Sequence, residues 1–186
     1  MGEARRRRLA LLAGLCPCGS SRPATTCCLK DGQLYRAPAQ IDLKSARGTV
    51  INKQCYFRET NRCSDVISAE HSVSKSVLRN FGKKEVRVSG FPWLKGSEKI
   101  IGIESLVSRH LCTVHNSALS PLDDTAGRFF RAIADCNVRA QHATDTYLFN
   151  GHDIERWMLK VLMGLAASRS LAVDGVRLAG DFDPLI

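Results

Sequence analysis

The chain has 186 residues, of which 44% are apolar and 24% are charged, a composition typical of a folded domain rather than a disordered segment. A membrane-spanning helix needs roughly 18 or more consecutive apolar residues, and no such run occurs, so we expect no membrane contact. The net charge of +9 combines +11 in residues 1–100 (19 Lys and Arg against 8 Asp and Glu) with −2 in residues 101–186 (8 against 10), and the basic first half predicts a polyanionic partner such as nucleic acid.

The first fifteen residues imitate a secretory signal, because Arg5–Arg8 precede the apolar run Leu9–Leu15. That run ends directly in Cys16 without the small residues of a cleavage site, so we predict a cytoplasmic protein. Its eight cysteines would then be reduced and available to a metal ion. In a secreted chain the same even number would instead predict disulfides.

Four cysteines lie within thirteen positions. The first two belong to the segment Cys16-Pro-Cys18-Gly-Ser, and eight residues separate Cys18 from the adjacent pair Cys27-Cys28. Zinc prefers four thiolate or imidazole ligands, and Gly19 permits a tight turn between them. So short a segment cannot fold alone, so the metal would supply its folding free energy. The pattern resembles the SEC-C motif, a zinc-binding module that begins CPCGS. The resemblance implies that zinc is held by Cys16, Cys18, Cys27 and Cys28.

A second set of ligands is divided between Cys55-x7-Cys63 and Cys112-x2-His115, with 48 residues between the two pairs. Cys-x2-His is a common half of a zinc site, and a distant second half joins two segments of one fold. We therefore predict a second structural zinc. His142 and His152 remain alternatives to His115 as the fourth ligand.

The dipeptide Glu70-His71 lies between these pairs, and Asn116 directly follows His115. This arrangement resembles the HNH nuclease family over about residues 55–130. In zinc-containing members an acid–histidine dipeptide ends a strand, and a second ligand pair leads into a His or Asn that opens a helix. The resemblance implies the ββα-metal fold and an endonuclease that hydrolyses phosphodiester bonds, with DNA as the expected substrate.

The resemblance also implies that His71 is the general base, and an imidazole with a pKa near 6.5 can accept a proton at neutral pH. Glu70 and Asn116 offer oxygen ligands, which suit Mg²⁺ or Mn²⁺ rather than zinc. Basic residues that follow His71 are expected to hold the phosphates of the nucleic acid: Lys75, Arg79, Lys83, Lys84 and Arg87.

Three departures from the family pattern leave open a catalytically inactive member. The first cysteine pair is spaced by seven residues instead of two. The asparagine that orients the catalytic histidine has only a weak counterpart in Asn80, and Ser74 stands near the place of a frequent proline. The alternative function is a non-catalytic zinc protein whose basic half docks nucleic acid or an acidic protein.

Periodicity predicts strands over Lys84–Ser89 and Asp65–Ser68. It predicts one helix with Ser120 as N-cap and Pro121 as its first residue, and another from near Asp153. The expected core faces are Leu122, Ala126, Phe129, Phe130 and Ile133 in the first helix, and Ile154, Trp157, Met158, Val161, Leu162 and Leu165 in the second. Cys136 is expected to be a core thiol of the first helix, and His110 is given no role.

Together these features predict an α+β protein in three parts. Residues 1–30 would form a SEC-C-like zinc knuckle, followed by a polar connector over residues 31–42. Residues 43–140 would form a zinc-stapled ββα-metal (HNH-like) domain, and residues 141–186 a C-terminal helical extension.

Overall fold

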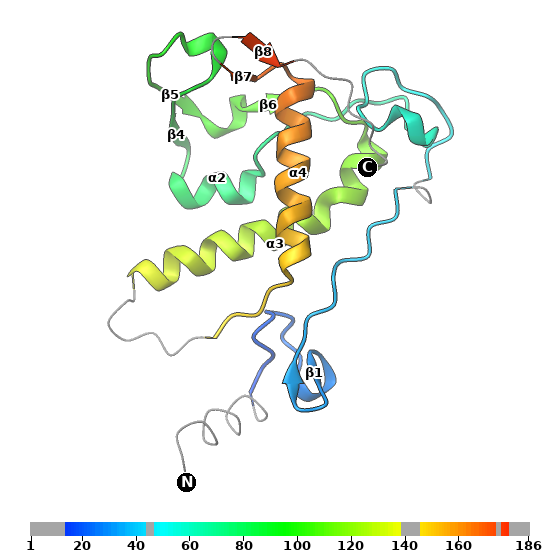
Figure 1. Cartoon of the computed structure of the whole chain (residues 1–186), viewed down its shortest axis with the longest axis vertical. Coiled ribbons are helices and arrows are strands. Elements are labelled where there is room, and N and C mark those ends of the chain that lie inside the picture. Colours follow the sequence, from blue (N-terminus) through cyan, green and yellow to red (C-terminus); the bar gives the residue numbers. More distant parts are fainter. Residues whose placement is uncertain (1–13, 44–46, 139–145, 174–175, 179–186) are drawn as a thin grey trace.

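The computed structural model describes residues 14–43, 47–138, 146–173 and 176–178 (Figure 1). Within these residues the predicted combination of helices and strands is confirmed, and no helix is long and apolar enough to cross a membrane. The α-helices of the described chain are α2 (Lys75–Phe81), α3 (Thr113–Val138) and α4 (Gly151–Ala167). Its strands form four two-stranded antiparallel sheets: β1 (Leu29–Lys30) with β2 (Gln33–Leu34), β3 (Glu70–His71) with β6 (Val107–Ser108), β4 (Glu85–Val88) with β5 (Lys99–Gly102), and β7 (Leu171–Val173) with β8 (Val176–Leu178).

Residues 14–35 form a small unit of loops and the β1–β2 sheet, called the N-terminal unit below, which lies apart from the other three sheets in the lower part of Figure 1. β1 and β2 pair as a hairpin through Asp31 and Gly32, which both have positive φ. The buried interior consists of three cysteines and one alanine: Cys16, Cys18, Ala24 and Cys28. So small an apolar core cannot stabilise the unit alone, so its stability depends on contacts with the rest of the chain or on a metal ion that the four cysteines could hold.

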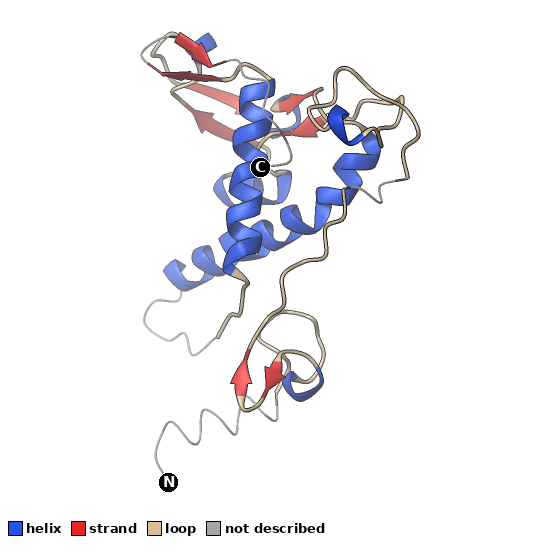
Figure 2. Ribbon diagram, turned by 45° about the vertical axis from the view of Figure 1, so that its right-hand side comes forward, coloured by secondary structure: helices blue, strands red, loops and turns tan. Residues whose placement is uncertain are grey.

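The central part of the chain places two short strands against the start of a long helix (Figure 2). β3 pairs with β6, with Glu70 opposite Ser108 and His71 opposite Val107. α3 begins five residues after β6, and the insertion between the two strands carries α2 and the β4–β5 hairpin. This order of strand, strand and helix brings the Glu70-His71 dipeptide near the first turns of α3.

The strand predictions have mixed outcomes. The strand predicted over residues 84–89 is confirmed as β4. Residues 65–68 are not a strand, because only Ile67 forms a bridge, with Cys112. The carbonyls of Ser64 and Asp65 instead accept hydrogen bonds from the Asn52 side chain, at 3.1 and 3.0 Å, and so do not join a strand ladder.

The predicted start of the first long helix at Ser120 is wrong, because α3 begins at Thr113 and contains Pro121 in its interior. Proline has no N–H to donate to the carbonyl four residues earlier. That carbonyl, on Ser117, accepts the Ser120 hydroxyl at 2.9 Å instead. The Ser-Pro pair that resembles a helix start is therefore accommodated inside a longer helix.

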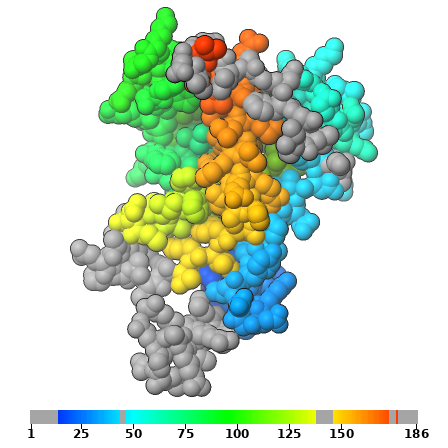
Figure 3. All heavy atoms as spheres, viewed as in Figure 1, coloured from blue at the N-terminus to red at the C-terminus, as the bar shows by residue number. Residues whose placement is uncertain are grey.

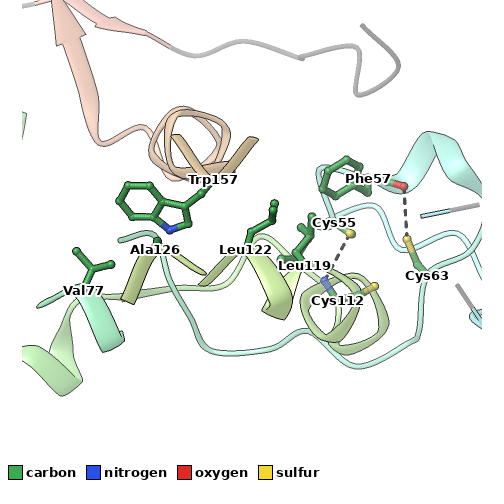
Figure 4. Packing of buried hydrophobic residues seen from close by; sticks show 10 residues of the cluster. Cys55, Phe57, Cys63, Val77, Cys112, Leu119, Leu122, Ala126 and Trp157 are labelled. Carbon is green, nitrogen blue, oxygen red and sulfur yellow. Dashed lines mark hydrogen bonds between the residues drawn. The ribbon is translucent and has the colours of Figure 1, made fainter. Parts of the chain in front are cut away.

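The main core lies where α4 crosses α3. Figure 4 shows Trp157 of α4 over Ala126 and Leu122 of α3, with Val77 of α2 beside them. The same buried cluster continues to the residues of the second ligand set, through Leu119, Phe57, Cys55, Cys63 and Cys112. The C-terminal helix and the second ligand set thus share one core.

The predicted apolar faces are only partly buried. Leu122, Ala126 and Trp157 lie in the core, but Met158, Leu162 and Ile133 are exposed in the described structure. Cys136 is also exposed, so its prediction as a core thiol is wrong. α3 has 26 residues whereas its neighbour α2 has only 7, so the two helices cannot pack along the whole of α3.

Gly127 allows α2 and α3 to approach closely, because a Cβ atom there would lie 2.5 Å from Oγ and 2.7 Å from Cβ of Ser76. In Gly127→Ala the better helix propensity of alanine contributes about 1 kcal/mol, but overpacking costs about 1–3 kcal/mol. We expect a lower free energy of unfolding, measured by urea denaturation. Gly151→Ala is the matched control, because a Cβ there meets nothing within 4 Å. Equal stability of the two variants would contradict the close contact.

Candidate metal centres and active-site pocket

The four cysteines of the N-terminal unit converge as predicted. Their Sγ atoms all lie within 4.8 Å of one another, and three of the four residues are buried. Gly19, with φ of 77°, makes the turn after Cys18, and its N–H donates to the Cys16 carbonyl at 3.0 Å. We call this set the first cluster: Cys16, Cys18, Cys27 and Cys28.

The surroundings of the first cluster favour thiolate at two positions. Burial acts to raise the pKa of the Cys18 thiol, but hydrogen bonds with Ser20, Cys16 and Cys27 outweigh it and lower the pKa to about 6. The hydroxyl of Ser20 lies 3.2 Å from Cys27 Sγ, and this hydrogen bond lowers the pKa of Cys27 as well. Since thiolate is the form that binds zinc, these shifts suit a metal site.

The second cluster consists of Cys55, Cys63, Cys112 and His115, whose ligand atoms also lie within 4.8 Å of one another and whose residues are all buried. Nδ1 of His115 faces the three sulfurs, at 3.1 Å from Cys112, 3.5 Å from Cys55 and 3.7 Å from Cys63. Burial raises the pKa of Cys55 to about 12 and lowers that of His115, which keeps the imidazole neutral as a ligand must be.

Thr60 orients the ring of His115 and was not predicted from the sequence. Its hydroxyl donates to the Phe57 carbonyl at 2.8 Å. It can therefore accept the Nε2–H of His115, 3.0 Å away, which leaves Nδ1 unprotonated toward the sulfurs. Such a partner for the outer nitrogen is usual for metal-binding histidines. Thr60 lies between the two cysteines of a long loop, and nothing in its local sequence distinguishes it.

The alternative ligands are not part of the second cluster. His152 is exposed and forms an ion pair with Glu155 at 3.1 Å, and His142 lies outside the described residues. His110 is half-buried, and its carbonyl accepts the Tyr56 N–H at 3.0 Å. The described residues thus contain two cysteine and histidine clusters that can hold metal ions, with donor sets that fit structural zinc.

The three predicted catalytic residues come together around one pocket of about 360 Å³, called the His71 pocket below. Glu70 and His71 come from β3, and Asn116 comes from the first turn of α3. Asn116 is held by its own N–H, which donates to the Cys112 carbonyl at 2.9 Å. The ligand residues Cys112 and His115 therefore place Asn116 in the site.

The orientation of His71 follows from its backbone partner. Its Nε2 lies 3.0 Å from the carbonyl oxygen of Ile103, at the start of a short 3-10 helix (Ile103–Ser105). A carbonyl only accepts, so Nε2 carries the proton, and in the neutral ring Nδ1 is a proton acceptor. This contact fixes the orientation of the ring.

A buried ion network supports the His71 pocket. Nζ of Lys160, from α4, lies 2.5 Å from both Glu70 Oε1 and Asp123 Oδ2, and the lysine side chain is only 4% exposed. Asp123 also accepts the Ser74 hydroxyl at 2.5 Å, and Ser74 accepts Trp157 Nε1–H at 2.7 Å. Burial raises the pKa of Glu70, and Lys160 partly offsets this effect.

Asp123 and Lys160 are residues of this site that sequence reasoning missed. In the sequence, Asp123 follows Ser120-Pro121 and looks like the acid of a helix start, a role that it does not have because α3 begins at Thr113. Lys160 lies three residues after the core residue Trp157, so both lie on the buried face of α4. A charged residue on that face was the feature of the sequence that could have indicated a role in the site.

The predicted phosphate-binding residues are distributed over α2 and the β4–β5 hairpin. Of the five, only Lys75 lines the His71 pocket, and it forms an ion pair with Glu104 at 2.5 Å. Arg87 pairs with Glu98 at 3.0 Å on the exposed hairpin. The others, Arg79, Lys83 and Lys84, are exposed.

Comparisons with protein-family models, with curated proteins and with solved structures found no match for this chain. The resemblances to the SEC-C motif and to HNH nucleases therefore rest on the residues that carry them.

Removal of the Lys160 charge is expected to destabilise the fold. Lys160→Met leaves two carboxylates beside each other without a cation, and breaking a buried pair in this way costs about 3–5 kcal/mol. The free energy of unfolding from urea denaturation measures this loss. Arg87→Met removes an ion pair whose side chains are 71% and 59% exposed, and should cost less than about 1 kcal/mol. Similar losses in the two variants would contradict the network.

Two zinc ions per chain are expected by elemental analysis of the reduced protein. Structural zinc contributes on the order of 10 kcal/mol, comparable to the stability of a domain, and the second cluster adjoins the main core. Cys112→Ser should therefore lose one zinc and unfold the main core.

Cys27→Ser is the comparison variant, because it removes a ligand from the N-terminal unit alone. It should also lose one zinc but keep a cooperative thermal transition of the main core. Two zinc ions and unchanged melting in Cys112→Ser would exclude Cys112 as a required ligand, and a single zinc ion in the wild type would remove one of the two sites.

Proposed function

We propose that the protein is a metal-dependent endonuclease of the HNH type, which hydrolyses phosphodiester bonds in DNA. The observation that carries this proposal is the convergence of Glu70, His71 and Asn116 on one pocket, with Nε2 of His71 held by a carbonyl. Three residue types from two distant segments, each matching an HNH motif, would not meet in this way through local structure alone.

His71 acts as the general base in this mechanism. Hydrolysis needs a group that takes a proton from the attacking water, and the unprotonated Nδ1 of His71 can accept it. The Ile103 carbonyl orients the ring, which is the task of the asparagine in the family pattern. Asn80 does not perform it, since its side chain donates to the Ser76 carbonyl at 2.9 Å within α2.

Glu70 and Asn116 are the residues that would hold Mg²⁺ or Mn²⁺, because their oxygens are ligands that these cations prefer. When bound, the cation polarises the phosphate and stabilises charge on the leaving oxygen. Lys160 engages Oε1 of Glu70, and Oε2 has no hydrogen bond with the described residues. Asp123 lines the same pocket and offers a further carboxylate.

The substrate is held through its phosphates. Lys75 lines the pocket, and Arg79 follows one turn later on α2, so both can reach a strand bound beside His71. We place the protein in the cytoplasm, where cysteines stay reduced and can bind zinc. No disulfide joins the cysteines of the described residues.

The alternative, a non-catalytic zinc protein that docks nucleic acid or an acidic protein, has one specific observation in its favour. Lys160 already lies 2.5 Å from both carboxylates of the pocket and compensates part of their charge. In that case the network would serve folding alone, and His71 would be a structural residue.

Plasmid nicking in Mg²⁺ or Mn²⁺ separates the two functions. We expect cleavage by the wild type, and a rate about 10²–10⁴ lower in His71→Ala, because that is the usual contribution of a general base. His152→Ala is the matched control, since this exposed histidine on α4 forms only a surface ion pair. Zinc content and melting temperature should be unchanged in both variants.

Two outcomes would contradict the proposal. Cleavage by His71→Ala at the wild-type rate would remove His71 as the base. Absence of cleavage by wild-type protein with two zinc ions, in either divalent cation, would favour the non-catalytic alternative.

A further inference from the structure

A second pocket, of about 490 Å³, lies between the N-terminal unit and α3. We call it the arginine pocket, because Arg36, Arg128 and Arg131 line it. Gly19 and Ser20 line it from the N-terminal unit, directly after the first-cluster ligand Cys18. Figure 3 shows the N-terminal unit, in blue, in contact with the helical part of the chain.

The arginine pocket has an excess of positive charge. Its three arginines face one carboxylate, on Asp124, so the lining residues carry a net charge of +2 (three minus one). Nη1 of Arg36 donates to the Cys18 carbonyl at 2.9 Å, and Nη1 of Arg128 donates to the same oxygen. Two guanidinium groups are thus drawn to one acceptor, although like charges repel.

This convergence leaves donors and charge unsatisfied. Nε of Arg36 is buried and has no hydrogen-bond partner among the described residues. A bound anion would accept from the unused N–H groups and remove the repulsion, and arginine forks match phosphate in particular.

The position of the pocket indicates the source of the phosphate. Ser76 of α2 lines both the arginine pocket and the His71 pocket, so the two adjoin across the α2–α3 contact. A strand whose scissile bond lies at His71 can therefore extend to the arginines. Free phosphate or a nucleotide would need only one of the two pockets.

We propose that the arginine pocket binds a backbone phosphate of the nucleic-acid strand, beyond the scissile bond at His71, and that the zinc-bound N-terminal unit forms one wall of this phosphate site. The proposal rests on the proposed function for the position of the scissile bond. It assigns the first cluster a role in substrate binding, because zinc fixes the loop of Gly19 and Ser20 against Arg128. A Cβ atom at Gly19 would lie 3.3 Å from Nη1 of Arg128, so the loop approaches the guanidinium closely.

The test is the binding of a fluorescent DNA duplex, measured by anisotropy against salt concentration without added Mg²⁺ or Mn²⁺. Arg131 is exposed, so Arg131→Gln should fold normally, with two zinc ions and an unchanged melting temperature. We expect several-fold weaker binding and a salt slope lower by about 1, the effect of one lost phosphate contact. Arg128→Gln should show the same loss. Arg169→Gln is the matched control and should bind like the wild type. Arg169 is exposed and follows the C-terminal end of α4, which is the end away from the N-terminal unit (Figure 1).

Unchanged affinity and salt slope in Arg131→Gln and Arg128→Gln would overturn the proposal, as would failure of the wild type to bind DNA. A third outcome would also overturn the proposal. If millimolar inorganic phosphate stabilises the wild type but not Arg128→Gln, while both bind DNA equally, the pocket is a site for free phosphate. Because this binding assay contains no catalytic cation, its result is separate from cleavage. Loss of binding in Arg131→Gln supports the site even where the wild type fails to nick plasmid, a result that would contradict only the proposed function.

Discussion

Cys55 and Cys63 lie on a loop that precedes β3, and Cys112 and His115 lie at the start of α3, yet their four ligand atoms come within 4.8 Å of one another in the core. Buried thiolates at this spacing repel each other unless a cation lies between them. A metal held by these four residues would tie the loop to the start of α3. Asn116 follows the last ligand directly, and β6 leads into Cys112, so the same constraint positions β3 with Glu70 and His71.

Lys160 provides the second constraint, because it connects α4 to the polar site. One lysine between the carboxylates of Glu70 and Asp123 compensates part of their charge, and Lys75, which lines the same His71 pocket, carries a further positive charge. The arginine pocket, whose lining residues carry a net charge of +2, lies next to it across Ser76. The two pockets therefore differ in their balance of charge.

The metal-binding residues could be predicted because ligand chemistry is carried by residue type and spacing. Together, the two clusters consist of the eight residues inferred from the sequence. The strand at residues 85–88 and the helix near residue 153 could also be predicted from local periodicity. Local signals failed where tertiary contacts outweighed them. Proline is common at the first position of a helix, but α3 begins two turns before Pro121, next to the ligands of the second cluster. The Ser120 hydroxyl donates to the Ser117 carbonyl, which the proline leaves without a donor.

By itself, the amino-acid sequence determined which side chains can bind zinc, that the first half is basic, and that an acid–histidine dipeptide precedes a ligand pair and an asparagine. Only the tertiary structure decided that Glu70, His71 and Asn116 share a pocket, that the Ile103 carbonyl orients His71, and that Thr60 orients His115. It also decided the pairing of Lys160 with Asp123, which lie 37 residues apart on two helices. The physical reason is the range of the interactions. Ligand spacing and helical periodicity act over a few residues, whereas a hydrogen bond to a distant carbonyl or a buried ion pair exists only once the helices have packed.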